Sequence, residues 1–290
     1  MKKYRLKVVF MFGLLIFIAG CGANEEKSKV KPNIISEQSK ITLDNGKVYV
    51  GQLKDNKPNG QGKTTFADGT SYEGQFKEGK PNGQGKITTT DGTSYEGQFK
   101  DGIPNGQGKL TAPNGYIFEG QFENGELNGQ GKITFGEGTI YEGQIKDGFP
   151  NGQGKTTHRD GMIEEGHFKN GVLYGQGKTT YPSGNIFEGQ YKNGSPNGQG
   201  IMTSPDGITW EGQFNGKTLN GQGKITHRDG IIEEGHFQDG KLNGQGKILF
   251  DDGTVYEGQF KNNKLNGKGK ITLTDGTSYT GQFRNGNPIK

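Results

Sequence analysis

An internal repeat with a fixed period of 23 residues constrains this sequence more than any other feature. The segment YEGQFKEGKPNGQGKITTTDGTS, residues 72–94, recurs along most of the chain without an insertion. The opening position of the repeat is held in turn by Tyr49, Tyr72, Tyr95, Phe118, Tyr141, Glu164, Phe187, Trp210, Glu233, Tyr256 and Tyr279. Periods of this size are typical of repeat proteins, in which each unit packs on its neighbours. The sequence therefore predicts a stack of similar units.

Composition agrees with a fold that lacks a conventional two-layer core. Of the 290 residues, only 27% are hydrophobic and 55 are glycine. The glycines fall at the same few positions of every repeat, so they belong to the repeat and are not low-complexity filler. Without a period, such a composition would indicate disorder. With the period, it indicates a regular structure built from turns and closely spaced backbone.

The charge balance argues against a nucleic-acid ligand. Four basic residues, Lys2, Lys3, Arg5 and Lys7, precede an apolar segment that we expect to be removed, which leaves 31 of the 35 basic residues against 31 acidic ones. A neutral chain with interspersed charges has no electrostatic footprint for a polyphosphate backbone. It also lacks the polybasic face that binds anionic lipids.

The N-terminus is expected to be a secretory signal peptide over residues 1–20. Its apolar run, Val8–Gly20, has thirteen residues and is too short to span a bilayer. The run ends in Ile18, Ala19, Gly20 and Cys21, which resembles the lipobox of bacterial lipoproteins except that leucine is commoner at the first position. The resemblance implies cleavage before Cys21 and transfer of a diacylglyceryl group to its thiol as a thioether, with palmitate as a typical acyl chain. Two or three acyl chains give a stable anchor.

This resemblance places the protein on the extracytoplasmic face of a bacterial cell membrane. Cys21 is the only cysteine, so a disulfide framework is excluded. Residues 21–40 are polar and without a period, and we interpret them as the acylated N-terminus and a flexible linker. The repeat region is then expected over residues 41–290.

Alternation within the repeat has a period of two, which predicts strands. Tyr72, Gly74 and Phe76 share one face of a first strand, and Gly85 and Ile87 share the same face of a second, expected over residues 85–89. The position of Thr89 is apolar in several other repeats, where it holds Phe66, Phe135, Tyr181, Phe250 and Leu273. Each unit is therefore predicted to be a β-hairpin.

The connections carry turn-forming residues. Within a unit we expect a loop over residues 79–83, which contains Gly, Pro and Asn. Between units, the position of Thr90 is proline in three repeats, at Pro113, Pro182 and Pro205. Proline followed by an Asn-like residue and glycine predicts a three-residue loop made of a type I turn and a bulge. A two-residue loop would place the proline in a ladder position, where it has no N–H to donate.

A three-residue loop sets the register of the predicted sheet. Ile87 falls opposite Tyr95 on one face, and Lys86 falls opposite Glu96 on the other. The same count places Lys109 opposite Glu119 and Lys132 opposite Glu142. Each exposed pair contributes only about 0.2–1 kcal/mol, but the series specifies the register of the sheet.

These residues resemble the MORN repeat family, whose unit reads approximately Tyr-Glu-Gly-x-aromatic-x-x-Gly-x-x-x-Gly-x-Gly. Residues 95–102, YEGQFKDG, and 106–108, GQG, fit position by position, and the match covers residues 41–290. The resemblance implies an all-β fold, an elongated and twisted single-layer antiparallel sheet of tandem hairpins. It also implies a membrane-associated scaffold, with protein interaction or self-association as the usual role and lipid head-group binding as another.

Two near-identical segments, residues 157–168 and 226–237, contain all four histidines, His158, His167, His227 and His236. Closely spaced His and Glu suggest a metal site. The alternation, however, places His158 beside Glu164 on the aromatic face and His167 on the opposite face, so one ion could not easily bind both histidines. We therefore predict a polar pair in place of an apolar one, and neither a metal nor a cofactor.

The aromatic stripe is the candidate interaction face. In a single-layer sheet we expect part of it to pack on the facing glycines and an uncovered remainder to bind a partner. Its residues are Tyr72, Phe76, Tyr95, Phe99, Phe118, Phe122, Tyr141, Phe187, Tyr191, Trp210, Phe214, Tyr256 and Phe260.

No nucleophile has an adjacent base, which argues against an enzyme. The expected function is protein interaction or self-association; the alternatives are cell-wall glycan binding and, third, lipid head-group binding.

The glycan alternative rests on the ability of aromatic rows to stack on sugars. Sugar-binding hairpin repeats are usually rich in tryptophan, whereas this chain has one, Trp210. The composition therefore favours a protein partner over a glycan.

Overall fold

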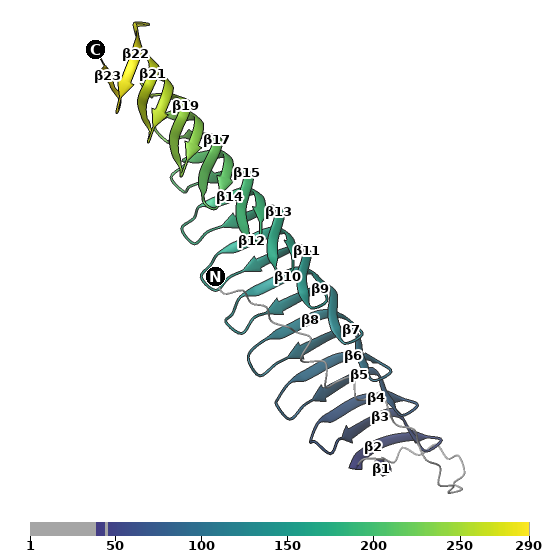
Figure 1. Ribbon diagram of the computed structural model, residues 1–290. Coiled ribbons are helices and arrows are strands. Elements are labelled where there is room, and N and C mark those ends of the chain that lie inside the picture. The colour runs from purple at the N-terminus through teal and green to yellow at the C-terminus, as the bar shows by residue number, and fades with distance from the viewer. Residues whose placement is uncertain (1–38, 44–45, 290) are drawn as a thin grey trace. The chain divides into compact units, whose positions relative to one another are not determined.

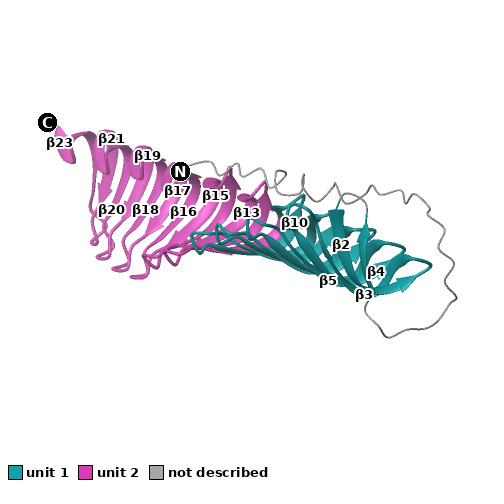
Figure 2. Ribbon diagram, turned by 90° about the horizontal axis from the view of Figure 1, so that it is seen from below, with its two compact units in different colours: residues 1–151 teal, residues 152–290 magenta. Residues whose placement is uncertain are grey.

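The computed structural model describes residues 39–43 and 46–289 (Figure 1). The predicted signal peptide, the lipobox with Cys21 and most of the linker lie outside these residues. The chain forms two compact units, unit 1 over residues 1–151 and unit 2 over residues 152–290 (Figure 2), which are described separately. Within the described ranges, no helix has the length and apolarity needed to cross a membrane.

The described residues form 23 β-strands. Unit 1 contains β1 (Ser39–Leu43), β2 (Lys47–Lys54), β3 (Lys57–Thr65), β4 (Ser71–Lys77), β5 (Lys80–Thr88), β6 (Ser94–Lys100), β7 (Ile103–Thr111), β8 (Ile117–Glu123), β9 (Glu126–Thr134) and β10 (Ile140–Lys146). The boundary between the units falls within β11 (Phe149–Thr157). Unit 2 contains β12 (Ile163–Lys169), β13 (Val172–Thr180), β14 (Ile186–Lys192), β15 (Ser195–Thr203), β16 (Thr209–Asn215), β17 (Thr218–Thr226), β18 (Ile232–Gln238), β19 (Lys241–Leu249), β20 (Val255–Lys261), β21 (Lys264–Thr272), β22 (Ser278–Arg284) and β23 (Asn287–Ile289).

The described strands belong to one antiparallel sheet. Within each unit, every strand pairs with the next strand in sequence, so the fold is a series of hairpins. The pairing of β5 with β6 places Ile87 opposite Tyr95 and Lys86 opposite Glu96. This confirms the predicted all-β class and the predicted register.

The loop between repeats has the predicted geometry. In the loop that joins β5 to β6, the Thr89 N–H donates to the Thr93 carbonyl at 2.9 Å and the Gly92 N–H donates to the Thr89 carbonyl at 3.0 Å. Gly92 has a φ of +87°. These two bonds and the left-handed glycine define a three-residue hairpin loop with a type I turn and a bulge. Proline is tolerated at the position of Thr90 because this residue donates no ladder bond.

The connection within a repeat differs from the expected loop over residues 79–83. It is a two-residue turn at Glu78 and Gly79, with φ values of +50° and +84°. Positive φ at both central residues defines a type I′ turn, whose twist matches that of the strands it joins. The second strand therefore begins earlier than expected, at Lys80, and contains Pro81. Proline has no N–H to donate to a neighbouring strand. Pro81 is nevertheless compatible with β5 because the pairing of β5 with β6 begins only at Gly83.

Each first strand meets its partner through a bulge that bends the hairpin. Gly74 pairs with Gly85 and Phe76 pairs with Pro81, so a single residue between Gly74 and Phe76 faces three residues of β5. Within this bulge Gly83 has a φ of +98°. Bulges bend a strand and increase its local twist. The bend brings the two ends of the hairpin towards each other, so that side chains on one face of the sheet contact one another.

We call this face the inner face; it carries Tyr72 and Phe76 on β4 and Pro81 and Ile87 on β5, all of them buried. The opposite, outer face carries Glu73 and other polar residues. A single-layer sheet thus obtains an interior by folding its inner face on itself. The interior of the β4–β5 hairpin holds two aromatic residues, one proline and one isoleucine.

The outer face carries the predicted Lys–Glu series. The amines and carboxylates of the three predicted pairs in unit 1 lie 3.5, 2.9 and 3.0 Å apart, in the order Lys86–Glu96, Lys109–Glu119 and Lys132–Glu142. Unit 2 repeats the arrangement at Lys155–Glu165 and Lys178–Glu188. These side chains are largely exposed, so the pairs specify register more than they stabilise the fold.

Candidate interaction surface

Most of the aromatic side chains expected to form an interaction face lie in the interior. Eleven of the thirteen are buried: Tyr72, Phe76, Tyr95, Phe99, Phe118, Phe122, Tyr141, Phe187, Tyr191, Phe214 and Phe260. Trp210 and Tyr256 are half-exposed. The packing of the stripe on the facing glycines, expected for part of it, therefore extends to most of these rings, because the bend in each hairpin packs them against one another.

In one group of repeats the aromatic residue at the opening position covers a glycine of the neighbouring strand. Tyr72 lies over Gly85, where a Cβ would overlap the phenol ring and its hydroxyl. The Tyr72 hydroxyl donates to the Gln75 carbonyl at 2.9 Å. Its ring meets those of Phe76 and Phe99 edge-on, with both centroid distances at 5.0 Å. Such aromatic pairs contribute about 0.5–1.5 kcal/mol each beyond simple burial.

This packing raises the pKa of the buried tyrosines. Burial raises the pKa of Tyr95 and of Tyr141 to about 12. The hydroxyl of each donates to a backbone carbonyl, at 3.0 Å for Tyr95 and 2.7 Å for Tyr141. A phenolate at either position would lose this bond and lie in an apolar environment.

In a second group of repeats a leucine fills the space above the glycine. Both Leu242 Cδ atoms lie 2.8 Å from the place where a Cβ of Gly246 would be. Leu219 fills the same space above Gly223, at 3.1 and 3.2 Å. In the first group of repeats a proline stands in place of this leucine. The proline ring is bonded to its own backbone nitrogen, whereas the branched leucine side chain extends over the glycine. The residue at the opening position of the repeat consequently does not occupy the space above the glycine.

The residue at the position of Pro81 separates these two arrangements. We call a repeat Pro-type where this residue is Pro58, Pro81, Pro104, Pro150 or Pro196, and Leu-type where it is Leu127, Leu173, Leu219, Leu242 or Leu265. In the Pro-type repeats the opening residues are buried: Tyr49, Tyr72, Tyr95, Tyr141 and Phe187. In the Leu-type repeats of unit 2 they are partly exposed: Glu164, Trp210, Glu233 and Tyr256.

Two repeats refine this rule. Phe118, in the Leu-type repeat of unit 1, stacks on Tyr116 with a centroid distance of 6.3 Å and is buried there. Tyr279 belongs to the repeat of Pro288, is followed by no further described repeat, and is 44% exposed. Burial of the opening residue thus depends on its own repeat and on the neighbouring one. The alternation of proline and leucine was visible in the sequence, but its consequence was not.

The two His–Glu segments form the predicted polar pairs. His158 Nε2 lies 2.9 Å from a Glu164 carboxylate oxygen, and His227 Nε2 lies 2.9 Å from Glu233 Oε1. His236 instead pairs with a backbone carbonyl, that of Asn243, through Nδ1 at 3.0 Å. Among the described residues, no group of three or more His, Cys, Asp and Glu side chains could hold a metal ion.

The surroundings of the two Glu residues differ. Glu164 pairs across the sheet with Thr179, whose hydroxyl bonds with the Tyr191 hydroxyl at 2.6 Å. Glu233 pairs with Ile225 and Ile248, and its Oε2 atom is buried without a hydrogen-bond partner. The second segment therefore holds a carboxylate oxygen whose hydrogen-bonding capacity is unused.

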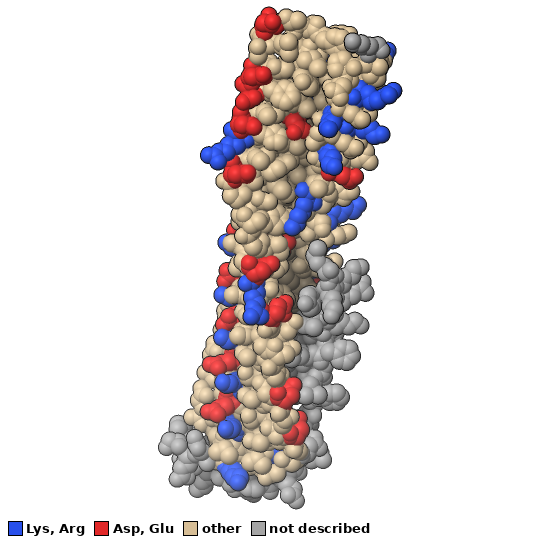
Figure 3. All heavy atoms as spheres, turned by 90° about the vertical axis from the view of Figure 1, so that its left-hand side faces the viewer, with Lys and Arg blue, Asp and Glu red and all other residues tan. Residues whose placement is uncertain are grey.

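The half-exposed part of the inner face in unit 2 continues towards the three-residue loops. It includes the rings of Tyr181 and Phe250 and the side chains of Ile208 and Ile231. Figure 3, which faces the left-hand side of Figure 1, shows uncharged surface between acidic and basic side chains in the upper part of the view. Together with Trp210, these side chains give the inner face of unit 2 partly exposed aromatic and aliphatic groups.

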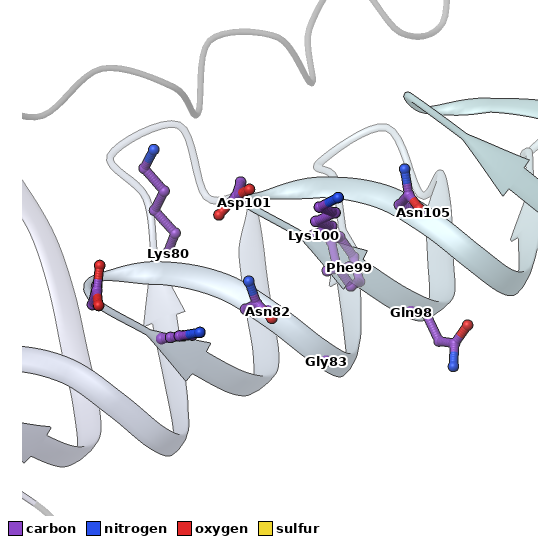
Figure 4. Close-up of a pocket in the computed structure, with 10 residues that line it drawn as sticks. Lys80, Asn82, Gly83, Gln98, Phe99, Lys100, Asp101 and Asn105 are labelled. Carbon is purple, nitrogen blue, oxygen red and sulfur yellow. The ribbon is translucent and has the colours of Figure 1, made fainter.

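The outer face has two further features near the type I′ turns. In unit 1 a hollow of about 620 Å³ lies between two successive turns and is lined by the same positions of both repeats, including Lys77 with Lys100 and Asn82 with Asn105 (Figure 4). Its lysines alternate with acidic residues, so it has no single sign of charge. In unit 2, Tyr174 is 45% exposed, and the amine of Lys169 lies 5.1 Å from its ring centroid.

Tandem antiparallel hairpins with an interior made from one folded face define a β-hairpin repeat protein. The MORN repeat family model matches residues 49–71, 72–94, 95–115, 118–140, 141–163, 165–186, 187–209, 210–232, 234–255, 256–278 and 279–288. The chain belongs to the MORN repeat family. A search of curated proteins found no match.

Three solved structures show distant similarity to this chain. The TCP domain of SAS-4 (dCPAP) from Drosophila melanogaster, in complex with a proline-rich motif of Ana2 (dSTIL), is 16% identical, with a TM-score of 0.34 over 61% of this chain and 89% of that one. The TCP10 domain of Danio rerio CPAP, in complex with a STIL peptide, is 15% identical, with a TM-score of 0.29 over 85% and 100%. Virginiamycin B lyase from Staphylococcus aureus is 14% identical, with a TM-score of 0.14 over 84% and 83%. These TM-scores are too low to support any conclusion about this chain.

Proposed function

We propose that this protein is a non-enzymatic, membrane-anchored scaffold that binds a partner protein through its MORN repeats. The anchor is the acylated Cys21, on the extracytoplasmic face of a bacterial membrane, and this part of the proposal rests on the lipobox-like sequence. The partner binds the half-exposed inner face of unit 2. The scaffold role agrees with the family to which the chain belongs.

The observation that carries the proposal is the difference in exposure between Pro-type and Leu-type repeats. Where Pro-type repeats bury the opening residue, the Leu-type repeats of unit 2 display Trp210 and Tyr256. Tryptophan and tyrosine are enriched at the energetically dominant positions of protein interfaces. Ile208 and Ile231 add aliphatic surface beside them. An accessible group of this composition supports protein binding.

The His–Glu pairs fit a structural role within their hairpins. Each Nε2 atom is held by a glutamate of its own hairpin at 2.9 Å, as in a structural polar pair. We therefore place these residues in the architecture of the inner face.

Affinity capture from the protein's own cell envelope tests the scaffold. The mature chain, from Cys21 without its acyl groups, is incubated with separated protein, membrane-lipid and purified cell-wall fractions. Capture of a defined protein that is lost in Trp210→Ala/Tyr256→Ala, and retained in the outer-face control Tyr174→Ser, supports the proposal. Capture by purified wall, with none from the protein fraction, would overturn it in favour of a glycan ligand.

The anchor is tested independently in cells. Cys21→Ala is expected to leave the precursor uncleaved and to abolish labelling by radioactive palmitate. Fractionation of Ile18→Leu, which restores the commoner lipobox residue, provides the matched control and should remain membrane-bound. Normal labelling of Cys21→Ala would contradict the lipoprotein assignment.

A further inference from the structure

One edge of the hairpins in unit 2 is basic. We define the turn edge as the two-residue turns within repeats together with the residue on either side of each turn. Among the described residues of unit 2, seven of the eight charged residues on this edge are basic. The eight, all exposed, are Lys169, Lys192, Lys217, Asp239, Lys241, Lys261, Lys264 and Arg284. The turn edge of unit 2 is therefore a basic column.

The opposite edge of the same hairpins is acidic. We define the loop edge as the three-residue loops between repeats together with the residue on either side of each loop. Within the described part of unit 2, six of the eight residues with a formal charge on this edge are acidic. The eight, all exposed, are Arg159, Asp160, Asp206, Arg228, Asp229, Asp251, Asp252 and Asp275. A chain whose charges balance overall thus has one acidic and one basic edge in unit 2.

Both edges border the same strip of the inner face. In the upper part of Figure 3 the acidic and the basic side chains form two columns with uncharged surface between them. The amine of Lys217, on the turn edge, lies 4.3 Å from the ring centroid of Tyr181, on the loop edge. Between the edges, Trp210 and Tyr256 are half-exposed. The strip is therefore a partly apolar surface with one acidic and one basic border.

Unit 1 does not have this segregation of charge. Its described turns, with the residue on either side, carry six basic and six acidic residues, and the two signs are intermixed. Lys77 and Lys80, for example, flank Glu78. The same hairpin architecture thus has a uniform edge only in unit 2, and a partner that recognises this charge pattern is expected there.

We propose that unit 2 forms a parallel homodimer through this strip, an inference that rests on the proposed scaffold function and names a second copy of the chain as the partner of the inner face. A rotation of 180° about the long axis of the strip brings the two strips face to face. It places the acidic edge of each copy opposite the basic edge of the other. Such an interface is isologous and closes as a dimer.

The charge pattern selects the parallel arrangement. A two-fold axis across the strip would make the copies antiparallel and place like charges opposite each other, which costs free energy. In the parallel dimer the edges also match in spacing, because successive turns and successive loops both lie two strands apart, about 10 Å. Exposed ion pairs are individually weak, so the partly apolar strip supplies the attraction and the charged edges supply the orientation.

Two further features agree with this dimer. The carboxylates of Glu164 and Glu233, which lie in the strip, are each paired with a histidine at 2.9 Å, so they bring no unpaired carboxylate group to the interface. A parallel dimer also directs both chains the same way, as two copies anchored in one membrane through Cys21 require. Anchoring would raise the effective concentration of the copies and favour a weak dimer.

Sedimentation velocity of the mature full-length chain, without acyl groups, tests the dimer at about 0.1 M salt. The turn-edge variant places glutamate at positions where Glu123 and Glu126 are found in unit 1. It is Lys192→Glu/Lys241→Glu/Lys261→Glu/Lys264→Glu. Its turn edge is acidic, so it should dimerise more than about ten-fold more weakly than the unmodified chain. Far-ultraviolet circular dichroism should be unchanged.

The loop-edge variant reverses the other border with residues that these loops already carry. Arginine occupies the first loop position at Arg159 and Arg228, and asparagine replaces the aspartate of the second position at Asn114. The variant is Pro205→Arg/Asp251→Arg/Thr274→Arg/Asp206→Asn/Asp252→Asn/Asp275→Asn. Alone it should also lose the dimer, whereas an equimolar mixture of the two variants should recover it, because each acidic edge again meets a basic one.

The matched control makes the same four changes at the same repeat positions of unit 1. It is Lys54→Glu/Lys57→Glu/Lys77→Glu/Lys80→Glu, and it should leave dimerisation unchanged. At about 1 M salt, where the Debye length falls to about 3 Å, the difference between the unmodified chain and the turn-edge variant should shrink.

Energy transfer between labelled chains tests the orientation. Cys21→Ser removes the only cysteine, and single cysteines are then introduced by Thr277→Cys or Arg159→Cys, near opposite ends of the strip. Transfer between two labels at position 277 should be strong, and transfer from 277 to 159 should be weak. The reverse result would overturn the parallel arrangement.

A chain that is monomeric at both salt concentrations, or a mixture of the two variants that does not recover the dimer, overturns the homodimer. Binding of the monomeric chain to vesicles of anionic lipid would then assign the basic edge to a membrane. If the envelope assay still captures a different protein that is lost in Trp210→Ala/Tyr256→Ala, this inference fails and the scaffold proposal stands. Capture of the protein itself supports both.

Discussion

Leu265 Cδ2 lies 3.0 Å from the place where a Cβ of Gly269 would be, in the space that a tyrosine ring fills above the equivalent glycine of Pro-type repeats. Tyr256, which opens the Leu265 repeat, packs edge-on against Phe250 at 4.9 Å and is half-exposed. In this repeat the leucine takes the space that an aromatic ring fills in Pro-type repeats, and the tyrosine ring lies partly at the surface. In a repeat protein, this single position can vary the surface while the hairpin stays the same.

Leu265→Pro is expected to convert a Leu-type repeat into a Pro-type repeat. With the space above Gly269 empty, the Tyr256 ring should move over this glycine and its hydroxyl should donate to the Gln259 carbonyl, as Tyr72 donates to the Gln75 carbonyl. Nitration of Tyr256 by tetranitromethane, followed by mass spectrometry, measures the change, and the variant should be protected. Leu265→Ala also empties the space and should lower the free energy of unfolding by about 2–5 kcal/mol. Unlike proline, alanine does not fix the backbone φ at this position. Undiminished nitration in Leu265→Pro would contradict the rule.

Gly85→Ala is expected to destabilise its hairpin by about 1–3 kcal/mol through overpacking against Tyr72. The backbone of Gly85 has an ordinary φ, so the effect is steric only. Gly216→Ala tests the opposite case, since nothing lies within 4 Å of its Cβ position and φ is +64°. Its cost should be limited to about 1–2 kcal/mol for a left-handed residue.

Urea denaturation combined with hydrogen exchange measures both glycine variants. In a Tyr72→Ala background, Gly85→Ala should have little further effect, because the ring that it would displace is absent. An additive double mutant would show that Tyr72 is not the neighbour that constrains Gly85.

Charge reversal at one Lys–Glu pair should have a small effect that depends on salt. Lys86 and Glu96 lie 3.5 Å apart and are mostly exposed. Lys86→Glu should reduce stability by up to about 1 kcal/mol at low ionic strength, and less at high salt. The swapped pair Lys86→Glu/Glu96→Lys should restore it. Thermal unfolding at two salt concentrations provides the measurement, and failure of the swap to recover any stability would contradict the pairing.

Alkaline pH should unfold the Pro-type repeats between about pH 10 and pH 12. In the unfolded chain tyrosine ionises near pH 10, whereas burial raises the pKa of Tyr95 and of Tyr141 to about 12. The folded state is therefore fully stabilised by these groups below pH 10, and this contribution is lost as the pH rises towards 12. Absorbance at 295 nm, recorded together with circular dichroism, should show late tyrosine ionisation coincident with loss of strand signal. Ionisation of all tyrosines near pH 10, with the fold intact, would contradict this packing.

Local features of the sequence were sufficient for the hairpins, the loops between them and the register. Pro113 and its equivalents set the length of the loop between repeats, because proline excludes a ladder position. The alternation of Tyr72, Gly74 and Phe76 set the face of each strand, and the Lys86–Glu96 pair followed from both. All of these depend on residues close in sequence. The turn at Glu78 and Gly79 was missed because Pro81 was interpreted as a turn residue, although Asp-Gly and Asn-Gly pairs elsewhere at this position favour a type I′ turn.

The sequence by itself determined that this protein is a series of antiparallel β-hairpins with a 23-residue period and one apolar face. Only the tertiary structure decided that this face folds on itself and which of its side chains remain accessible. The physical reason is that burial of Tyr72 depends on the bulge in its hairpin and on Phe99 of the next repeat. The space above the glycine of the second strand is filled by Tyr72 in one repeat and by Leu242 in another. Alternation predicts which face a side chain occupies, but packing between repeats decides whether that face is interior or surface.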